Sequence, residues 1–195
     1  PGRWPTDPID FSPLENLDAD IKLRSKALVY GNYSISNSVL AATVNNGVLQ
    51  VEKLNGELFG GTINATATAT ATSPPTIEST VSLKNLSVEK SLLAVIAESP
   101  AGGRAGIDFK LASSGYTASD LVAALAGGGS IDLKGINVSR GGKGTAFSSV
   151  LGILSELNII SGSLSGKKAD AGLADITGTF NVNKGIAQSD DLILA

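Results

Sequence analysis

The sequence contains no histidine, no cysteine and, as printed, no methionine. Without histidine, neither Ser-His-Asp nor Cys-His nucleophilic catalysis can be built, and imidazole metal sites are excluded. Without cysteine, disulfides and zinc-thiolate centres are excluded as well. The remaining chemistry is limited to carboxylates, lysines and hydroxyls. We therefore expect a protein that is not an enzyme and that uses no cofactor and no metal.

Aromatic residues and clustered positive charge are also scarce. Aromatic residues make up 5% of the chain while hydrophobic residues make up 42%, so the core must be aliphatic. The 15 basic and 18 acidic residues give a net charge of −3 and form no basic run. Nucleic-acid binding requires a basic surface, and nucleic acid is therefore not an expected partner. No run approaches 18 apolar residues, so no transmembrane helix is expected within the chain.

Most of the chain instead shows the two-residue alternation of half-buried strands. In residues 17–24, for example, Ala19, Ile21 and Leu23 alternate with charged residues. Residues 62–72 alternate strictly between hydroxylated or amide side chains and small apolar ones. Further strands are predicted at residues 39–44, 48–54, 77–83, 107–111, 131–138, 176–182 and 186–194. The proline-rich segment before them, residues 1–16, is predicted to be an extended lead-in to a single domain over residues 17–195.

Two turns and three helices complete the prediction. Asn46-Gly47 and Lys184-Gly185 are predicted at hairpin turns, because such pairs tolerate positive φ. Amphipathic patterns predict short helices over residues 87–98, 120–126 and 147–157. Ser87 and Ser119 are the expected N-caps of the first two, and Gly127 the expected end of the second.

The 62–72 strand is the strongest candidate for a binding surface. Its small side chains leave space beside the sheet, which either an acyl chain or the helix over residues 87–98 could fill. If the face is open, the candidate lipid-facing residues are the apolar ones of this strand and the next: Ile63, Ala65, Ala67, Ala69, Ala71, Ile77, Val81 and Leu83.

Acidic residues offer the only route to catalysis. Asp190 and Asp191 are adjacent, and neighbours in a strand point to opposite faces, so they are expected on a solvated edge. A deep pocket in which acids converge, for instance from Asp108, Asp132 or Asp175, would instead indicate an enzyme acting on envelope glycan.

Several short signatures, none of them specific alone, occur in a characteristic order over nearly the whole chain. They are Trp4, Pro8-Ile9-Asp10-Phe11, Leu14, Leu17-Asp18-Ala19-Asp20-Ile21-Lys22-Leu23, Asn46-Gly47-Val48-Leu49, Leu54, Gly56-Glu57-Leu58-Phe59-Gly60-Gly61-Thr62-Ile63, Gly115, Asp120-Leu121 and Leu125-Ala126-Gly127-Gly128-Gly129-Ser130-Ile131-Asp132-Leu133-Lys134-Gly135-Ile136. In this order and spacing they resemble the C-terminal part of the AsmA family.

The resemblance implies a periplasmic module, tethered to the inner membrane by an N-terminal helix outside this chain. It also implies a curved, largely antiparallel sheet that forms a groove or partial barrel. The family normally continues past the last strand, so the domain is expected to be truncated at its C-terminus. The chain starts at Pro1, and we expect it to be part of a longer protein.

The sequence thus predicts a mainly β (α+β) fold with about three short helices. The resemblance implies a role in outer-membrane biogenesis, through binding or transfer of phospholipid or a lipopolysaccharide-related lipid. The alternative is a scaffold that regulates outer-membrane protein insertion through contacts with envelope proteins.

Overall fold

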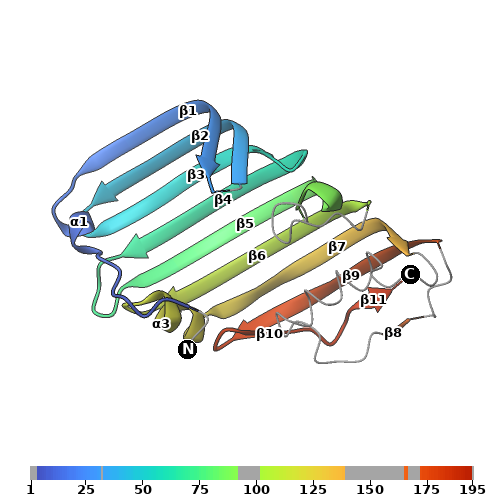
Figure 1. Ribbon diagram of the computed structural model, residues 1–195. Helices are drawn as coiled ribbons and strands as arrows, with labels where there is room; N and C mark the ends of the chain where they lie inside the picture. The colour runs from blue at the N-terminus through green and yellow to red at the C-terminus, as the bar shows by residue number, and fades with distance from the viewer. Residues whose placement is uncertain (1–3, 32, 92–101, 139–164, 167–171, 195) are drawn as a thin grey trace.

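The computed structural model describes residues 4–31, 33–91, 102–138, 165–166 and 172–194. These residues form one curved, open sheet of eleven strands, in the order β1-β2-β3-β4-β5-β6-β7-β9-β11-β8, with β10 paired to β9 (Figure 1). Every pairing is antiparallel except that of β11 with β8. The predicted mainly β, largely antiparallel fold is confirmed.

Eight strands are long and follow each other along the sheet nearly in sequence order. They are β1 (Ala19–Tyr30), β2 (Tyr33–Asn45), β3 (Val48–Leu58), β4 (Gly61–Thr70), β5 (Thr76–Ser87), β6 (Arg104–Ser114), β7 (Ala126–Val138) and β9 (Gly172–Asn183). The remaining three are β8 (Ser165–Gly166), β10 (Ile186–Gln188) and β11 (Ile193–Leu194). At about 3.3 Å per residue, strands of 10 to 13 residues extend for roughly 33–43 Å.

The predicted turns lie where strands reverse direction. Asn46 and Gly47, with φ of 48° and 76°, connect β2 to β3. Lys184 and Gly185, with φ of 51° and 72°, connect β9 to β10. All four residues occupy the left-handed region, which asparagine and glycine adopt at lower cost than most residues.

Short helices cap the ends of the sheet. Helix α1 (Ser12–Glu15) interrupts the lead-in, which was expected to be extended throughout. Helix α3 (Ala118–Ala123) follows β6. Residues 88–91 are helical, and the Lys90 N–H donates to Ser87 Oγ at 3.3 Å. The rest of the predicted 87–98 helix and the predicted 147–157 helix lie outside the described residues.

Helix α3 corrects the predicted cap and helix end. Its N-cap is Thr117, whose hydroxyl accepts the Asp120 N–H while the Asp120 carboxylate accepts the Thr117 N–H, so that two otherwise unpaired amides are satisfied reciprocally. Ser119 is therefore a residue of the first helical turn. Gly127 does not end the helix, because β7 has already begun at Ala126.

The predicted strand over residues 186–194 is also wrong in part. The segment divides into β10 and β11, and the residues between them belong to no strand. There the Asp191 carboxylate accepts the Thr179 N–H of β9 at 2.7 Å. A side chain thus replaces a main-chain partner at this point, and the ladder cannot continue. Among the described residues, no helix is long and apolar enough to cross a membrane.

Candidate functional site

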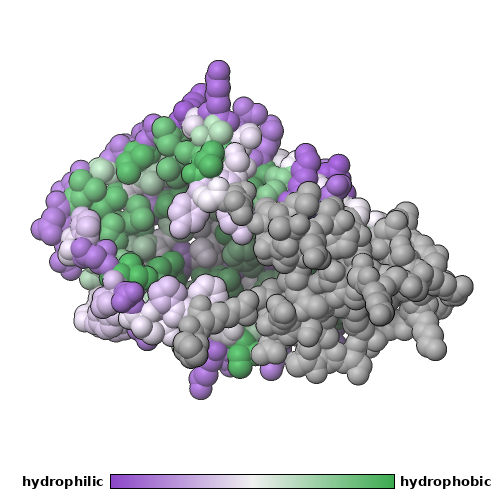
Figure 2. Space-filling view, viewed as in Figure 1, coloured by the Kyte–Doolittle hydropathy of each residue, from purple (hydrophilic) through white to green (hydrophobic). Residues whose placement is uncertain are grey.

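One face of the sheet is apolar across many strands. Cross-strand register aligns Ala65 of β4 with Val81 of β5, and Val81 with Phe109 of β6. On the other side of β4, Ala65 lies opposite Leu54 and Ala67 opposite Val51 of β3. Because the neighbouring strands alternate in register with β4, their apolar side chains form continuous rows across the sheet. Figure 2 shows hydrophobic side chains gathered on the side facing the viewer, over the first strands of Figure 1.

We call this surface the apolar face. All eight lipid-facing candidates are only half-buried. Seven of them lie within β4 or β5, and Ala71 lies directly after β4. Register pairs Ile63 with Leu83 and Ala69 with Ile77, which places members of the group side by side. The three candidates inside β4 other than Ile63 are alanines, whereas those of β5 are larger, so the alanine row is the shallowest part of the face.

β-Bulges extend the apolar face in a way that strict alternation does not predict. In β5, Lys84 and Asn85 separate Leu83 from Leu86, and the register with β6 shifts there by one residue. Asn85 has a φ of 56°. The extra residue returns Leu86 to the same face as Leu83, and Leu86 is buried.

A β-bulge of the same kind occurs in β7. Lys134 and Gly135 separate Leu133 from Ile136, Gly135 has a φ of 62°, and Leu133 and Ile136 are both buried. The shared sequence pattern is Leu-Lys, then Asn or Gly, then Leu or Ile. The sequence prediction did not include Leu86 or Ile136 in the apolar face, although this repeated pattern was the available signal.

Helix α3 closes one end of the apolar face. Its residues Leu121 and Val122, with Leu125 after it, line a cavity of about 180 Å³ together with Ile77 and Leu111. The Ser113 hydroxyl of β6 hydrogen-bonds to the Leu121 carbonyl and fixes the helix on the sheet. Ligand pockets usually measure about 300–1,000 Å³, so this cavity could hold the end of an apolar chain but not a whole lipid.

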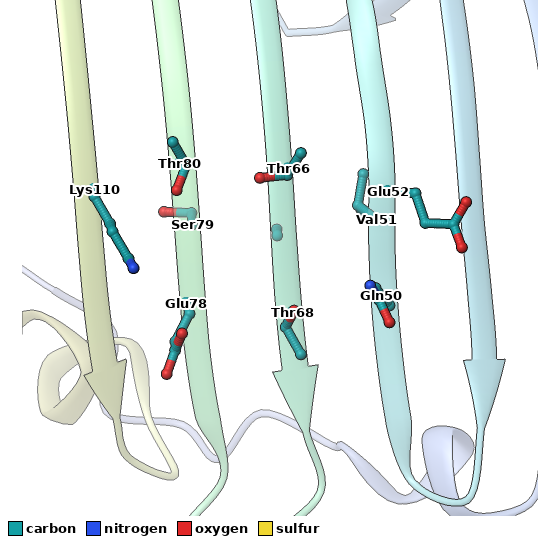
Figure 3. A pocket seen from close by; sticks show the side chains of 10 residues that line it. Gln50, Val51, Glu52, Thr66, Thr68, Glu78, Ser79, Thr80 and Lys110 are labelled. Carbon is teal, nitrogen blue, oxygen red and sulfur yellow. The ribbon is translucent and has the colours of Figure 1, made fainter.

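The opposite face of the same strands is polar. A hollow of about 380 Å³ crosses β3 to β6, and polar side chains from neighbouring strands project into it (Figure 3). Its side chains include Gln50, Thr68, Glu78 and Lys110. Within the described part of the chain, no three acidic side chains are grouped so that they could hold a metal ion.

The three acids that could have indicated an enzyme do not converge in one pocket. Asp108 and Asp132 line a hollow of about 330 Å³ on the polar face, together with Arg104 and Lys134. Asp132 pairs with Lys134 at 3.1 Å. Its Oδ1 atom is buried without a hydrogen-bond partner among the described residues. Asp175 does not line this hollow. Its carboxylate accepts the Gly135 N–H at 2.8 Å and supports the bulge in β7.

The adjacent acids Asp190 and Asp191 are both exposed, but only the second has a defined structural role. Asp191 accepts hydrogen bonds from the Thr179 hydroxyl and amide, both at 2.7 Å, and from the Ser189 hydroxyl at 3.2 Å. The Thr179 bonds are the main reason that the pKa of Asp191 lies below its ordinary value. The carboxylate thus remains charged and ties β9 to the segment before β11.

The fold and this face define a class of protein: a β-sheet groove with one apolar side. Comparison with protein families then gives the particular family. The model of the AsmA family matches residues 2–192, nearly the whole chain, and the chain belongs to this family. Membership is consistent with a role in the cell envelope, in outer-membrane or lipid biogenesis. No curated protein and no solved structure matches the chain.

Proposed function

We propose that this chain is a non-enzymatic module of the cell envelope that binds the acyl chains of a phospholipid or a lipopolysaccharide-related lipid. In the longer protein, tethered to the inner membrane, the module would lie in the periplasm and take part in passing lipid between membranes. The observation that carries the proposal is the half-buried alanine row of β4, flanked by larger apolar residues on β3 and β5.

The physical argument starts from exposed apolar area. Removing apolar surface from water stabilises a complex by about 25 cal/mol per Å², or about 0.8 kcal/mol for each buried CH₂ group. The alanines of β4 are smaller than their partners Val51 and Leu54 on one side and Val81 on the other, so we infer a shallow channel along this row. A flexible hydrocarbon chain fits such a channel, because its affinity comes from area rather than from directed hydrogen bonds.

The polar character of the opposite face is consistent with lipid binding on the apolar face. Hydroxyl, amide and charged side chains cover the other side of β4 and β5, including Thr66, Thr68 and Glu78. That surface can stay in contact with water while the apolar face holds lipid. The module needs no chemical step for this function, and we propose that it has no turnover.

A scaffold for outer-membrane protein assembly is the second candidate. At the end of the β1–β2 hairpin, Val29 is 71% exposed and Tyr30 is 86% exposed. Tyrosine is enriched in the core of protein interfaces, where its ring buries area and its hydroxyl keeps a polar contact. This tip could contact an envelope protein without any lipid on the apolar face.

Lipid loading distinguishes the two candidates. We expect native mass spectrometry of the chain, purified from bacterial envelope, to detect bound phospholipid or a lipopolysaccharide-related lipid. Ala67→Asp should reduce loading of a fluorescent phospholipid at least several-fold, because it places a charge in the apolar channel. Thr66→Asp is the matched control, since it places the same carboxylate on the polar face of the same strand.

A second variant distinguishes loss of lipid binding from unfolding of the chain. Ala67→Leu adds no charge but fills the channel, so it should also reduce loading while circular dichroism stays unchanged. If no lipid co-purifies, and if Ala67→Asp and Thr66→Asp load equally, the lipid proposal is wrong and the scaffold takes its place.

A further inference from the structure

Among the described residues, no strand pairs with the outer edge of β1, the first strand of the sheet. Strand β1 pairs with β2 on one side and lies at the end of the strand order (Figure 1). The lead-in does not cover its other side, because the Ile9 N–H donates to the Tyr116 carbonyl at 2.8 Å and the Ser119 N–H to the Pro5 carbonyl at 3.0 Å. The lead-in therefore runs past the strand ends toward α3.

This edge has only one of the features that usually prevent pairing with another strand, its charged side chains Asp20, Lys22, Arg24 and Lys26. Natural edge strands are commonly short, bulged or interrupted by proline. β1 has 12 residues, no proline and no register shift in its pairing with β2. The apolar residues Ile21 and Leu23 are 39% and 41% exposed, respectively. An added strand would place its own apolar side chains beside both of them.

The charges along β1 show which strand would fit. Asp18, which lies directly before β1, and Asp20 are followed by Lys22 and Arg24 at the same two-residue spacing, and all four are exposed. Within one chain, Asp20 already pairs with Lys22 at 3.1 Å. Two antiparallel copies of this segment, centred on Ile21, place each Asp20 opposite a Lys22 and each Asp18 opposite an Arg24. That register has four opposite-charge pairs and no like-charge pair.

Neighbouring two-fold registers are worse. Centring on Lys22 sets Lys22 against itself, and centring on Asp20 sets Asp20 against itself. Centring on Leu23 sets Lys22 against Arg24. Like charges directly opposite are destabilising, while opposite charges contribute about 0.2–1 kcal/mol per pair. Only the register centred on Ile21 is favourable throughout, and it also sets Ile21 against Ile21 on the apolar face.

We propose that two copies of this chain associate edge to edge through β1, in the antiparallel register centred on Ile21. The two-fold axis is perpendicular to the sheet, because residues that are paired in this register lie on the same face. The two apolar faces then join into one surface across sixteen long strands, twice the eight of one chain. This association does not depend on whether lipid binds.

Charge reversal tests the register. We expect sedimentation velocity to show a concentration-dependent dimer of the unmodified chain. D18K/D20K and K22E/R24E should each raise the dissociation constant by about tenfold or more, since each sets like charges opposite one another. An equimolar mixture of the two variants should restore association, because every pair between them is again of opposite sign.

Cysteine cross-linking gives an independent measure. The chain has no cysteine of its own. I21C should form a disulfide-linked dimer under mild oxidation, because directly opposed Cβ atoms in an antiparallel pair are about 4.5–5.5 Å apart. V29C is the control: Val29 is more exposed, at 71%, but lies outside the proposed pairing and should cross-link much less.

The outcomes separate clearly. A chain that stays monomeric at every concentration, or variants whose mixture fails to associate, would overturn the proposal. Cross-linking of V29C as fast as I21C would show that the pairing is not through this register. Because lipid loading is measured separately, failure of the dimer leaves the proposed lipid function intact, and the reverse also holds.

Discussion

Apolar side chains are exposed to solvent to different extents in the two halves of the sheet. In β4 and in β5 before its bulge, Ile63, Ala67 and Val81 are half-buried, whereas Leu86 beyond the bulge is buried. In β7 and β9, Ile136 and Ile176 are 0% exposed. The two-residue alternation is similar in both halves. Alternation therefore decides which face a side chain occupies, whereas neighbouring elements decide how much of it water reaches.

This difference bears on function. A closed apolar region supplies stability, while an open one can exchange water for a ligand. The half formed by β7 and β9 thus serves as the core of the domain. The half formed by β3, β4 and β5 has the exposed area that lipid binding requires.

Truncation of one isoleucine in each half should give the largest contrast. We expect Ile176→Ala to lower the free energy of unfolding by about 2–5 kcal/mol, because a fully buried side chain loses its contacts and leaves a cavity. Ile63→Ala should cost about 1 kcal/mol, because part of that side chain already contacts water. Urea denaturation measures both.

Equal costs for these two substitutions would contradict the contrast, since they would mean that the apolar face of β4 is closed as well. A cost of Ile63→Ala that rises only when lipid is bound would sharpen it.

The sequence predicted well which face of the sheet each side chain occupies, but it predicted poorly how deeply the side chains are buried. The period of two placed all eight lipid-facing candidates on or beside β4 and β5, because alternation follows directly from strand geometry. Alternation alone could not predict the bulges of β5 and β7, since these depend on single residues at positive φ, Asn85 and Gly135, and only the repeated pattern around them indicates the bulges.

The first glycine of β7, Gly127, was misread for a related reason. Gly127 was expected to end a helix, yet Gly127 to Gly129 all pair with β6 and β9. Glycine marks both turns and places where another backbone comes close, and sequence alone does not separate these uses. Tertiary contacts decide here, because the Phe180 ring lies against Gly129.

A smaller effect is expected at that glycine. A Cβ atom at position 129 would clash with the Asp108 carbonyl oxygen and lie 2.8 Å from Phe180 Cζ. Gly129→Ala should therefore lower the free energy of unfolding by about 1–3 kcal/mol, the usual cost of overpacking.

Gly102→Ala is the matched control, because a Cβ there would have no heavy atom within 4 Å. It should change stability by less than about 0.5 kcal/mol. If thermal unfolding shows the two variants to be alike, the strands around β7 are less closely packed than the structure indicates.

The smallest expected effect concerns a charge at the margin of the closed half. Asp191 has a pKa below its ordinary value of 3.8, mainly because Thr179 donates two hydrogen bonds to the carboxylate. A group whose pKa is lowered by folding stabilises the folded state above its unfolded pKa, and this contribution is lost as the pH falls through the lowered folded value. Asp191→Asn should therefore reduce the urea midpoint modestly near pH 7, and the difference from the unmodified chain should shrink below about pH 4. Asp190→Asn, which removes the neighbouring exposed carboxylate, should show a smaller change at pH 7. A difference between Asp191→Asn and the unmodified chain that stays constant with pH would mean that the Thr179 bonds do not depend on the charge, and that the edge of the closed half is held by packing alone.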